Sequence, residues 1–467
     1  MRTPRARRRD TLRLMGFDPA LLLPILRRLP PAQRYLVAFS GGCDSCVLLH
    51  ALVVLRGQLT APVAAVHVDH GLQSGSEAWL QRCEAQCAAW QVPFVGRRVN
   101  ARARAGESGE AAARKARYDA MRALMQAGDV LLAAHHRDDQ AETFLLQLLR
   151  GAGPRGLAAM PECTPFGSGY LARPLLGFTR DEICAYASRA GLHWIDDPSN
   201  FDTVFDRNYL RNEVMPRLRQ RWPAAGRVIA RAATHQAESV QLLDALAEID
   251  AAQTGAGEAL SVAALQTLSG ARARNLLRWW IRSRGLPVPD ATRLSRILDE
   301  VAGARVDAEP CVKWQGAEAR RYRDGLFVLA PPAPIPAAAL PWEPHSELVV
   351  PGLGILNAVL APGGLSPEVC EAGLTVRFGV AGERCRPTGH AHHRTLKKLW
   401  QQAGVPPWVR ERTPLLYVEG RLAAVAGRWI CAEFAVSARE TGWLPIWRPF
   451  GVETKGENGD NSSGPAP

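Results

Sequence analysis

The sequence contains no long apolar run and very little lysine. No stretch of its 467 residues approaches the ~18 consecutive apolar residues of a membrane-spanning helix, because even residues 47–55 are interrupted by His50. A membrane partner is therefore not expected. Lysine occurs at only five positions, Lys115, Lys313, Lys397, Lys398 and Lys455. Arginine supplies the rest of the 57 basic residues, and in an alanine-rich chain this bias is typical of genomic base composition rather than of phosphate recognition.

Closely spaced cysteine pairs, the mark of a disulfide framework, are also scarce. The ten cysteines are spread through the chain, which is typical of reduced thiols and predicts a cytoplasmic protein. Residues 2–9 are rich in arginine, but no apolar segment with a small-residue cleavage site follows them. We therefore interpret the N-terminus as a basic arm and not as a secretory signal.

The length and composition indicate a globular protein of several domains. At roughly 150 residues per domain, 467 residues predict about two to four units. A content of 47% hydrophobic and 22% charged residues excludes a mostly disordered or fibrous chain. The net charge of +12 favours a polyanionic partner such as nucleic acid.

The first half of the chain has the pattern of an α/β fold. Short apolar runs of strand type alternate with longer helical stretches, which predicts a doubly wound parallel sheet. We expect strands at 35–39, 63–68, 94–99 and 130–134, and crossover helices at 44–56, 77–91, 109–127 and 138–150. Such sheets bind ligands outside the carboxyl ends of their strands.

Composition shifts divide the chain further. Beyond residue 216 the strand signals stop, and amphipathic helices are expected at 227–250, 265–284 and 291–302, followed by a small β patch at 311–329. The predicted organisation is a basic arm (1–32), an α/β domain (33–216), a mainly helical middle domain (217–330), a Pro/Ala linker (331–346), a small α/β C-terminal domain (347–450) and a disordered tail (451–467).

The strongest motif lies between the first expected strand and its helix. It comprises Ser40, Gly41, Gly42, Cys43, Asp44 and Ser45. Glycines let backbone N–H groups approach phosphate oxygens, hydroxyls add donors, and the helix N-terminus attracts anions. Asp44 is then placed to hold a Mg²⁺ ion that bridges the phosphates. The alternative is a tight turn in which Asp44 or Ser45 caps the helix.

The loop lacks the Gly-Lys-Ser/Thr of a Walker A motif, so transfer of the γ-phosphoryl group is not indicated. It resembles the PP-loop of ATP pyrophosphatases. That resemblance implies cleavage between the α- and β-phosphates, with an adenylylated substrate oxygen and release of pyrophosphate.

Further segments resemble the tRNA(Ile)-lysidine synthetases. In the α/β domain and just beyond, these are residues 67–72, 113–118, 134–143, 150–153, 173–176, 194–200 and 207–211. After the linker, residues 387–390 and 396–408 resemble the C-terminal domain of that family. The similarity covers nearly all of residues 33–445.

The resemblance implies a carbon–nitrogen ligase that joins free L-lysine to C2 of the wobble cytidine in the AUA-reading isoleucine tRNA, which has a CAU anticodon. ATP, with Mg²⁺, adenylylates the C2 oxygen, and the lysine ε-amine then displaces AMP. The chain would act in the cytoplasm on tRNA and lysine. A homodimer is left open, because the sequence does not specify the oligomeric state.

Site residues follow from the resemblance and from chemistry. Catalysis is assigned to Asp44, Asp139 and Arg114, and ATP binding to residues 40–45 with His67 and His135. Lysine binding is assigned to Asp139 and Glu142, which are one helical turn apart. The residues assigned to tRNA binding are Arg207, Arg211, Arg394, Lys397 and Lys398. The alternatives are that Asp138 and Asp139 only cap a helix, that the basic residues are solvated, and that the histidines are structural. A zinc site is not indicated, because no Cys/His set has ligand spacing.

Two rival functions remain. Cys43 and Cys46 form a C-x-x-C, and Cys83 and Cys87 lie one helical turn apart, as a related PP-loop enzyme that thiolates tRNA could require. Core packing is the favoured interpretation, because Cys43 occupies the variable position of the loop and Cys46 lies on the following helix. The second rival is a non-catalytic tRNA-binding protein that keeps only the fold.

Overall fold

The computed structural model describes residues 16–69, 71, 76–100, 109–305 and 308–450. Two compact units divide the chain, Met1–Leu246 and Ala247–Pro467, and each is described by itself. Within the described ranges, no helix combines the length and the apolar character needed to cross a bilayer.

The first unit is built on a six-stranded sheet of order β3-β2-β1-β4-β6-β5. Its strands are β1 Arg34–Ala38, β2 Val63–Asp69, β3 Phe94–Arg98, β4 Asp129–Leu132, β5 Cys163–Phe166 and β6 Gly169–Ala172. All neighbours are parallel except β5, which runs antiparallel to β6. The four strands expected from the sequence are confirmed, whereas β5 and β6 were not predicted.

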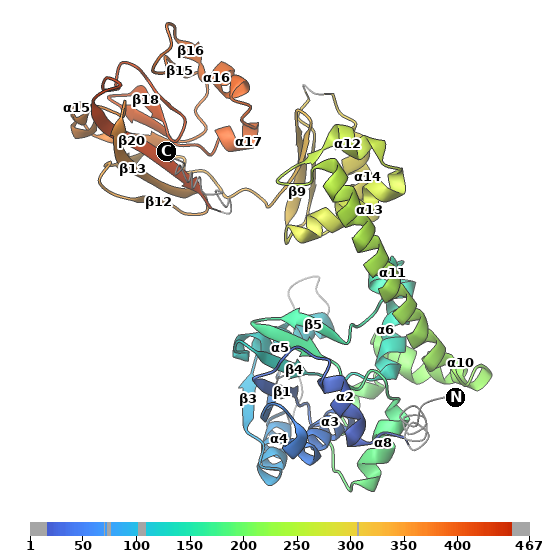
Figure 1. Ribbon diagram of the computed structural model, residues 1–467. Helices are drawn as coiled ribbons and strands as arrows, with labels where there is room; N and C mark the ends of the chain where they lie inside the picture. The colour runs from blue at the N-terminus through green and yellow to red at the C-terminus, as the bar shows by residue number, and fades with distance from the viewer. Residues whose placement is uncertain (1–15, 70, 72–75, 101–108, 306–307, 451–467) are drawn as a thin grey trace, which may run out of the picture. The chain divides into compact units, whose positions relative to one another are not determined.

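Helices cover both faces of this sheet (Figure 1). They are α3 Cys43–Val54, α4 Ser76–Ala89, α5 Gly109–Leu124, α6 Arg137–Leu149 and α8 Arg180–Arg189, joined by the short η2 Arg56–Gln58 and α7 Pro154–Leu157. Alternate residues of β1 enter different cores: Tyr35 and Val37 pack with α3, and Leu36 packs with Met121 of α5. The expected doubly wound arrangement is therefore confirmed.

The predicted N-terminal arm is wrong for its second half. Residues 16–32 include η1 Pro19–Leu22 and α2 Leu23–Leu26, and Phe17 is buried against the rings of Phe178 and Tyr186 at 4.9 and 5.1 Å. The apolar content of this segment, not its charge, decides its position, because burying such side chains stabilises the fold. Residues 1–15 lie outside the described ranges.

Helical segments complete the first unit. After α8 they are η3 Pro198–Phe201, α9 Asp206–Tyr209, the π-helical turn η4 Leu210–Val214 and α10 Met215–Arg221. The 30-residue helix α11, Ala225–Thr254, then continues into the second unit.

The middle region joins helices to a small sheet. Helices α12 Val262–Thr267, α13 Gly270–Ser283, α14 Ala291–Arg296 and η5 Ile297–Ala302 accompany a sheet of order β7-β10-β9-β8, with β7 Leu260–Ser261, β8 Cys311–Trp314, β9 Ala317–Tyr322 and β10 Gly325–Leu329. The predicted helix at 265–284 is two helices, because the chain turns at Ser269, the N-cap of α13. The expected β patch corresponds to β8, β9 and β10.

The C-terminal region is mostly antiparallel. Its strands are β11 Leu340–Trp342, β12 Leu348–Val350, β13 Gly354–Pro362, β14 Leu374–Arg377, β15 Arg384–Cys385, β16 Arg394–Thr395, β17 Leu415–Val418, β18 Arg421–Val425, β19 Trp429–Ile430 and β20 Thr441–Pro449; its helices are α15 Pro367–Glu371, α16 Leu396–Gln402 and α17 Pro407–Arg410. The predicted linker ends earlier than expected, because β11 pairs with β14. The expected disordered tail, 451–467, lies outside the described residues.

Candidate active site

The predicted phosphate loop, residues 40–45, follows β1 and includes the first residues of α3. Gly42 is the N-cap and provides no side-chain cap, so the backbone N–H groups of the first helical turn are available to an anion. Ser45 donates its hydroxyl to the Gly42 carbonyl at 2.9 Å and lies 3.1 Å from the hydroxyl of Ser40. These contacts hold an open cradle and do not cap the helix, contrary to the alternative of a capped turn.

Gly41 is the residue that fixes the path of this loop. Its φ of +82° is readily adopted only by glycine, and a Cβ here would lie 2.8 Å from Cys83 Sγ and 2.9 Å from Ile195 Cδ1. Its carbonyl accepts a hydrogen bond from the Ile195 N–H at 2.9 Å. Helix α4 and the segment after α8 therefore pack against the loop and fix its position.

The cysteines near the loop pack in the core. Burial raises the pKa values of Cys46, Cys83 and Cys87 to about 12, so these thiols stay protonated at neutral pH. Cys43 Sγ lies 3.6 Å from Cys184 Sγ, and this contact lowers the pKa of Cys184 to about 7 while raising that of Cys43. Buried protonated thiols lack the thiolate character that sulfur transfer or a cluster requires.

Asp44 extends from the first turn of α3 toward the end of β4. Its Oδ2 lies 3.6 Å from His136 Nε2, and its Oδ1 is buried with no hydrogen-bond partner among the described residues. A buried carboxylate oxygen beside a phosphate cradle is a hard ligand of the kind Mg²⁺ prefers, so the residues present fit that ion.

His136 links Asp44 to the start of α6. Its Nδ1 accepts a hydrogen bond from the Asp139 backbone N–H at 3.3 Å, and the backbone N–H of His136 donates to Asp139 Oδ2 at 3.0 Å, which makes a reciprocal helix cap. The neutral ring therefore carries its proton on Nε2, which faces the carboxylates. Burial lowers the pKa of His136, but the contact with Asp44 and the charges of Asp139, Asp44 and Asp138 outweigh it and raise the pKa.

Four charged side chains form a buried cluster beside this cap. Arg207 donates to Glu142 Oε2 at 3.0 Å and to Asp139 Oδ1 at 3.1 Å. Arg211 donates to both oxygens of Glu142 at 2.8 and 2.9 Å and to Asp139 Oδ1 at 2.8 Å. Burial alone raises the pKa of Asp139, but His136 and the arginines lower it far below its usual range. We call these four residues the carboxylate–arginine cluster.

In this cluster, two residues assigned to lysine binding contact two residues assigned to tRNA binding. Asp139 and Glu142 do lie together on one face of α6, as their spacing predicted. Arg207 and Arg211, assigned to tRNA, instead contact these two carboxylates through Nε and Nη2. Across the parts of the chain that the structure describes, nothing accepts a hydrogen bond from their Nη1 atoms. Asp138 has a separate role, because it accepts a hydrogen bond from the Arg180 N–H at 2.8 Å and pairs with Arg219.

The remaining predicted residues of the first unit lie on neighbouring strand ends. His67, on β2, donates from Nδ1 to the Phe39 carbonyl just before the loop at 2.9 Å. His135 follows β4; burial lowers its pKa to about 3, and its Nδ1 has no partner among the described residues. Arg114, on α5, is exposed and lies over the ring of Tyr118 at 5.3 Å.

Comparisons with known proteins match the whole architecture. Family models match for a PP-loop domain at residues 21–218, a TilS substrate binding domain at 260–327 and a TilS substrate C-terminal domain at 374–447. A tRNA(Ile)-lysidine synthase of Methylococcus capsulatus is 45% identical over 428 residues, covering 90% of this chain and 98% of that protein. The chain belongs to the tRNA(Ile)-lysidine synthase family. The family resemblance seen in the sequence is thereby confirmed.

A second relative agrees with this placement in the lysidine synthase family. The tRNA(Ile)-lysidine synthase of Alkalilimnicola ehrlichii is 45% identical over 412 residues, which cover 88% of this chain and 93% of that protein. A solved U34-tRNA thiolase of Methanococcus maripaludis matches with a TM-score of 0.41 and 15% identity, over 47% of this chain and 77% of that chain. The rival thiolation function is not favoured, because the relatives that span most of this chain are lysidine synthases.

The basic residues assigned to the C-terminal domain of this lysidine synthase family member lie in the second unit. Lys397 and Lys398 are exposed on α16, and Arg394 precedes that helix and donates to the Gln402 side chain at 2.9 Å. The three residues lie within the region matched by the C-terminal family model.

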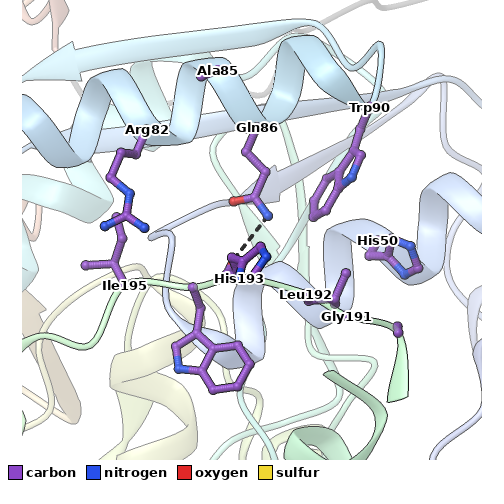
Figure 2. Close-up of a pocket in the computed structure, with 11 residues that line it drawn as sticks. His50, Arg82, Ala85, Gln86, Trp90, Gly191, Leu192, His193 and Ile195 are labelled. Carbon is purple, nitrogen blue, oxygen red and sulfur yellow. Dashed lines mark hydrogen bonds between the residues drawn. The ribbon is translucent and has the colours of Figure 1, made fainter. Parts of the chain in front are cut away.

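Sequence reasoning missed a pocket behind the phosphate loop, shown in Figure 2. It has a volume of about 470 Å³, and its lining includes His50 of α3, Arg82, Gln86 and Trp90 of α4, and residues 190–195. Gln86 donates to the His193 carbonyl at 3.3 Å across it. Its walls come from three distant segments, so no local pattern in the sequence could reveal it.

Proposed function

We propose that this protein uses ATP to ligate L-lysine to C2 of the wobble cytidine in the isoleucine tRNA with a CAU anticodon, releasing AMP and pyrophosphate. The observation that carries the proposal is the contact of Asp44 with His136, 3.6 Å between Oδ2 and Nε2. It joins an uncapped phosphate loop at β1 to the carboxylate–arginine cluster at β4, so that a phosphate site and an amine site adjoin. Family membership supports the same reaction.

In the first step the cytidine C2 oxygen attacks the α-phosphorus of ATP, and the bond from that phosphorus to pyrophosphate breaks. The backbone N–H groups of the loop and the hydroxyls of Ser40 and Ser45 hold the phosphates in place. Asp44 would hold Mg²⁺, which neutralises phosphate charge when bound. Arg114, on the neighbouring helix α5, supplies further positive charge toward the reacting phosphate.

In the second step the lysine ε-amine attacks C2, the bond from C2 to the AMP oxygen breaks, and a proton leaves the amine. Asp139 and Glu142 each accept three hydrogen bonds within the cluster and its cap. A carboxylate offers about four acceptor positions, so Glu142 can accept about one more donor from an ammonium group. Asp139 Oδ2 also lies 3.3 Å from His136 Nε2, so Asp139 attracts the ammonium mainly through its charge. The lowered pKa of Asp139 keeps it ionised, which suits holding the ammonium rather than removing its proton.

Contacts with tRNA complete the proposal. Nη1 of Arg207 and of Arg211 are directed to RNA phosphates near the cluster, while Arg394, Lys397 and Lys398 contact the RNA backbone from the second unit. These contacts position the tRNA without reading its bases. The reaction belongs in the cytoplasm, where tRNA and free lysine are present.

The test is incorporation of labelled L-lysine. Purified protein is incubated with ATP, Mg²⁺, labelled lysine and an in vitro transcript of the CAU-anticodon isoleucine tRNA, and label in RNA is measured with AMP release. Lysine-dependent labelling that disappears when the wobble cytidine is replaced by uridine is expected. AMP formation without labelling would refute lysine as the nucleophile while keeping the adenylylation step.

A further inference from the structure

Arg173 is a buried arginine at the carboxyl edge of the parallel sheet. It follows directly after β6 and is 7% exposed. Its backbone N–H donates to the Glu162 carbonyl at 2.8 Å, and its Nη1 donates to the Pro161 carbonyl at 2.8 Å. Because β6 pairs with β4 and β4 pairs with β1, Arg173 lies two strand spacings, roughly 10 Å, across the sheet from the phosphate loop.

Within the described residues, the charge of Arg173 has no carboxylate counter-charge. Over the described ranges, no carboxylate lies within ion-pair distance of its guanidinium, and its buried Nε has no hydrogen-bond partner. Burial lowers the pKa of Arg173, and the charge of Arg114 lowers it further, against a rise from the neighbouring Tyr118 phenol. A buried cation left in this state costs folding free energy, so a ligand that supplies negative charge would be bound strongly.

Arg34 shows the contrast at the opposite, amino edge of the same sheet. Its Nε donates to Asp129 Oδ1 at 3.1 Å, and its Nη2 pairs with Asp129 Oδ2 at 2.5 Å. Asp129 is 2% exposed, so this partly buried arginine is neutralised within the fold. Arg34 at the amino edge is thus paired, whereas Arg173 at the carboxyl edge has no carboxylate partner among the described residues.

The neighbours of Arg173 point to a ligand as well. Asp44 Oδ1, His135 Nδ1 and Arg173 Nε are three of the six buried side-chain polar atoms without a partner among the described residues. They follow β1, β4 and β6, which are adjacent in the sheet. Native proteins leave few such atoms, and three on consecutive strand ends indicate a surface completed by substrate.

We propose that Arg173 binds a phosphate group of a substrate at the end of β6. Nη1 is held by Pro161 and the Tyr118 phenol also hydrogen-bonds the guanidinium, so Nε, which has no partner among the described residues, is the donor left for a phosphate oxygen. The inference rests on the proposed function for the source of the phosphate, which is either the RNA backbone beside the target nucleotide or ATP. The distance across the sheet favours the RNA backbone.

The experiment compares Arg173→Met with Arg34→Met. Arg173→Met removes a buried charge that lacks a counter-charge, so the melting temperature of this variant should equal or exceed that of the wild type. Arg34→Met leaves the buried carboxylate of Asp129 without its cation, so this variant should have a lower melting temperature. Affinities are measured separately for tRNA, with its salt dependence, and for ATP without tRNA. At least a tenfold loss for one of the two is expected with Arg173→Met, and none with Arg34→Met.

The two binding measurements distinguish the sources of the phosphate. A loss confined to tRNA, with a reduced salt slope, assigns the site to an RNA phosphate, and a loss confined to ATP assigns it to the nucleotide. A lowered melting temperature with both affinities unchanged would overturn the proposal. If Arg173→Met does not fold, Arg173→Lys is the second variant, because it keeps the positive charge and removes the planar guanidinium. Unchanged affinities in Arg173→Lys would also overturn the proposal.

The proposed function can fail independently of this site. Neither the melting temperature nor the binding measurements depend on lysine incorporation. Wild-type protein that binds tRNA or ATP through Arg173 but transfers no lysine would uphold the phosphate site and refute the ligase reaction.

Discussion

Arg211 donates two hydrogen bonds to the buried carboxylate of Glu142, from Nε to Oε1 at 2.8 Å and from Nη2 to Oε2 at 2.9 Å. Glu142 is 2% exposed, so this two-point contact is largely removed from water. Such a pair contributes less to stability than its geometry suggests, because both charges lose hydration. Removing one partner is nevertheless destabilising, because the other charge stays buried without a counter-charge. Stability and substrate binding are therefore coupled at this point.

Arg211→Met should lower the free energy of unfolding by about 3 kcal/mol, because Glu142 and Asp139 lose a shared cation. Urea denaturation measures the change. Arg217→Met on the neighbouring helix is the matched control; it breaks an exposed pair with Glu213, 3.7 Å long, and should cost less than about 1 kcal/mol. Equal losses in the two variants would mean that the buried cluster is not a stability determinant.

Gly41→Ala should destabilise the fold by about 1–3 kcal/mol and weaken ATP binding at least tenfold, because the new Cβ meets Cys83 and Ile195 in a left-handed conformation. Gly151→Ala is the control: its φ is +70° but nothing lies within 4 Å, so it should cost only about 1 kcal/mol and leave ATP binding unchanged. Isothermal titration with ATP and thermal denaturation measure both effects. Normal ATP affinity in the Gly41→Ala protein would show that the loop does not bind phosphate.

Asp44→Asn should reduce AMP formation at least ~100-fold while tRNA affinity stays unchanged, because an amide is a poorer ligand for a divalent cation than a carboxylate. A readout independent of turnover is the rise in melting temperature that Mg²⁺ causes in the presence of ATP; this rise should occur in the wild type and be absent in the variant. The same rise in both proteins would remove Asp44 from the metal site.

His135 should make the fold sensitive to acid. Its pKa is lowered from 6.5 to about 3 in the folded protein, so between these values the unfolded chain binds more protons. Stability is therefore complete above about pH 6.5 and falls as the pH decreases, by up to about 1.4 kcal/mol per pH unit. His135→Asn should flatten this decline in denaturation curves between about pH 7 and pH 4.5, whereas His235→Asn, at an exposed histidine, should not.

Lys397→Glu with Lys398→Glu should weaken tRNA binding and reduce the slope of log K against log salt by about 2, because two phosphate contacts are lost. Both side chains are exposed on α16, so the variant should fold normally. Lys313→Glu, at a side chain 72% exposed that lies 3.9 Å from Glu318, is the control for a charge reversal outside α16 and should leave the slope nearly unchanged. An unaltered slope in the double variant would remove this surface from the RNA interface.

Local patterns were sufficient for much of the fold. The apolar runs at β1, β2, β3 and β4 and the helices between them were predicted to within a few residues, because side-chain periodicity and glycine turns act over short distances. Strands β5 and β6 escaped prediction because they are short and one of them includes Pro165. The prediction of a basic arm was wrong for residues 16–32, because this segment also carries apolar side chains that pack with Phe178 and Tyr186.

The pairing of side chains within the candidate site could not be predicted from the sequence. The spacing of Asp139 and Glu142 placed them on one face of α6, as found. That Arg207 and Arg211 would contact them could not be read from the sequence, because the arginines and the carboxylates are separated by a long stretch of chain. Arg173 lies in a segment that resembles the family, residues 173–176, but the sequence assigns it no role, because burial and the absence of a counter-charge among the described residues are properties of the packed structure.

Short motifs were enough to predict the loop at residues 40–45, the parallel α/β domain and the family, because their chemistry is local. Which arginines are neutralised depends instead on packing: Arg34, Arg207 and Arg211 face carboxylates, and Arg173 faces none within the described residues. The physical reason is that the cost of burying a charge is set by what surrounds it, and those surroundings are assembled from distant segments only when the chain folds.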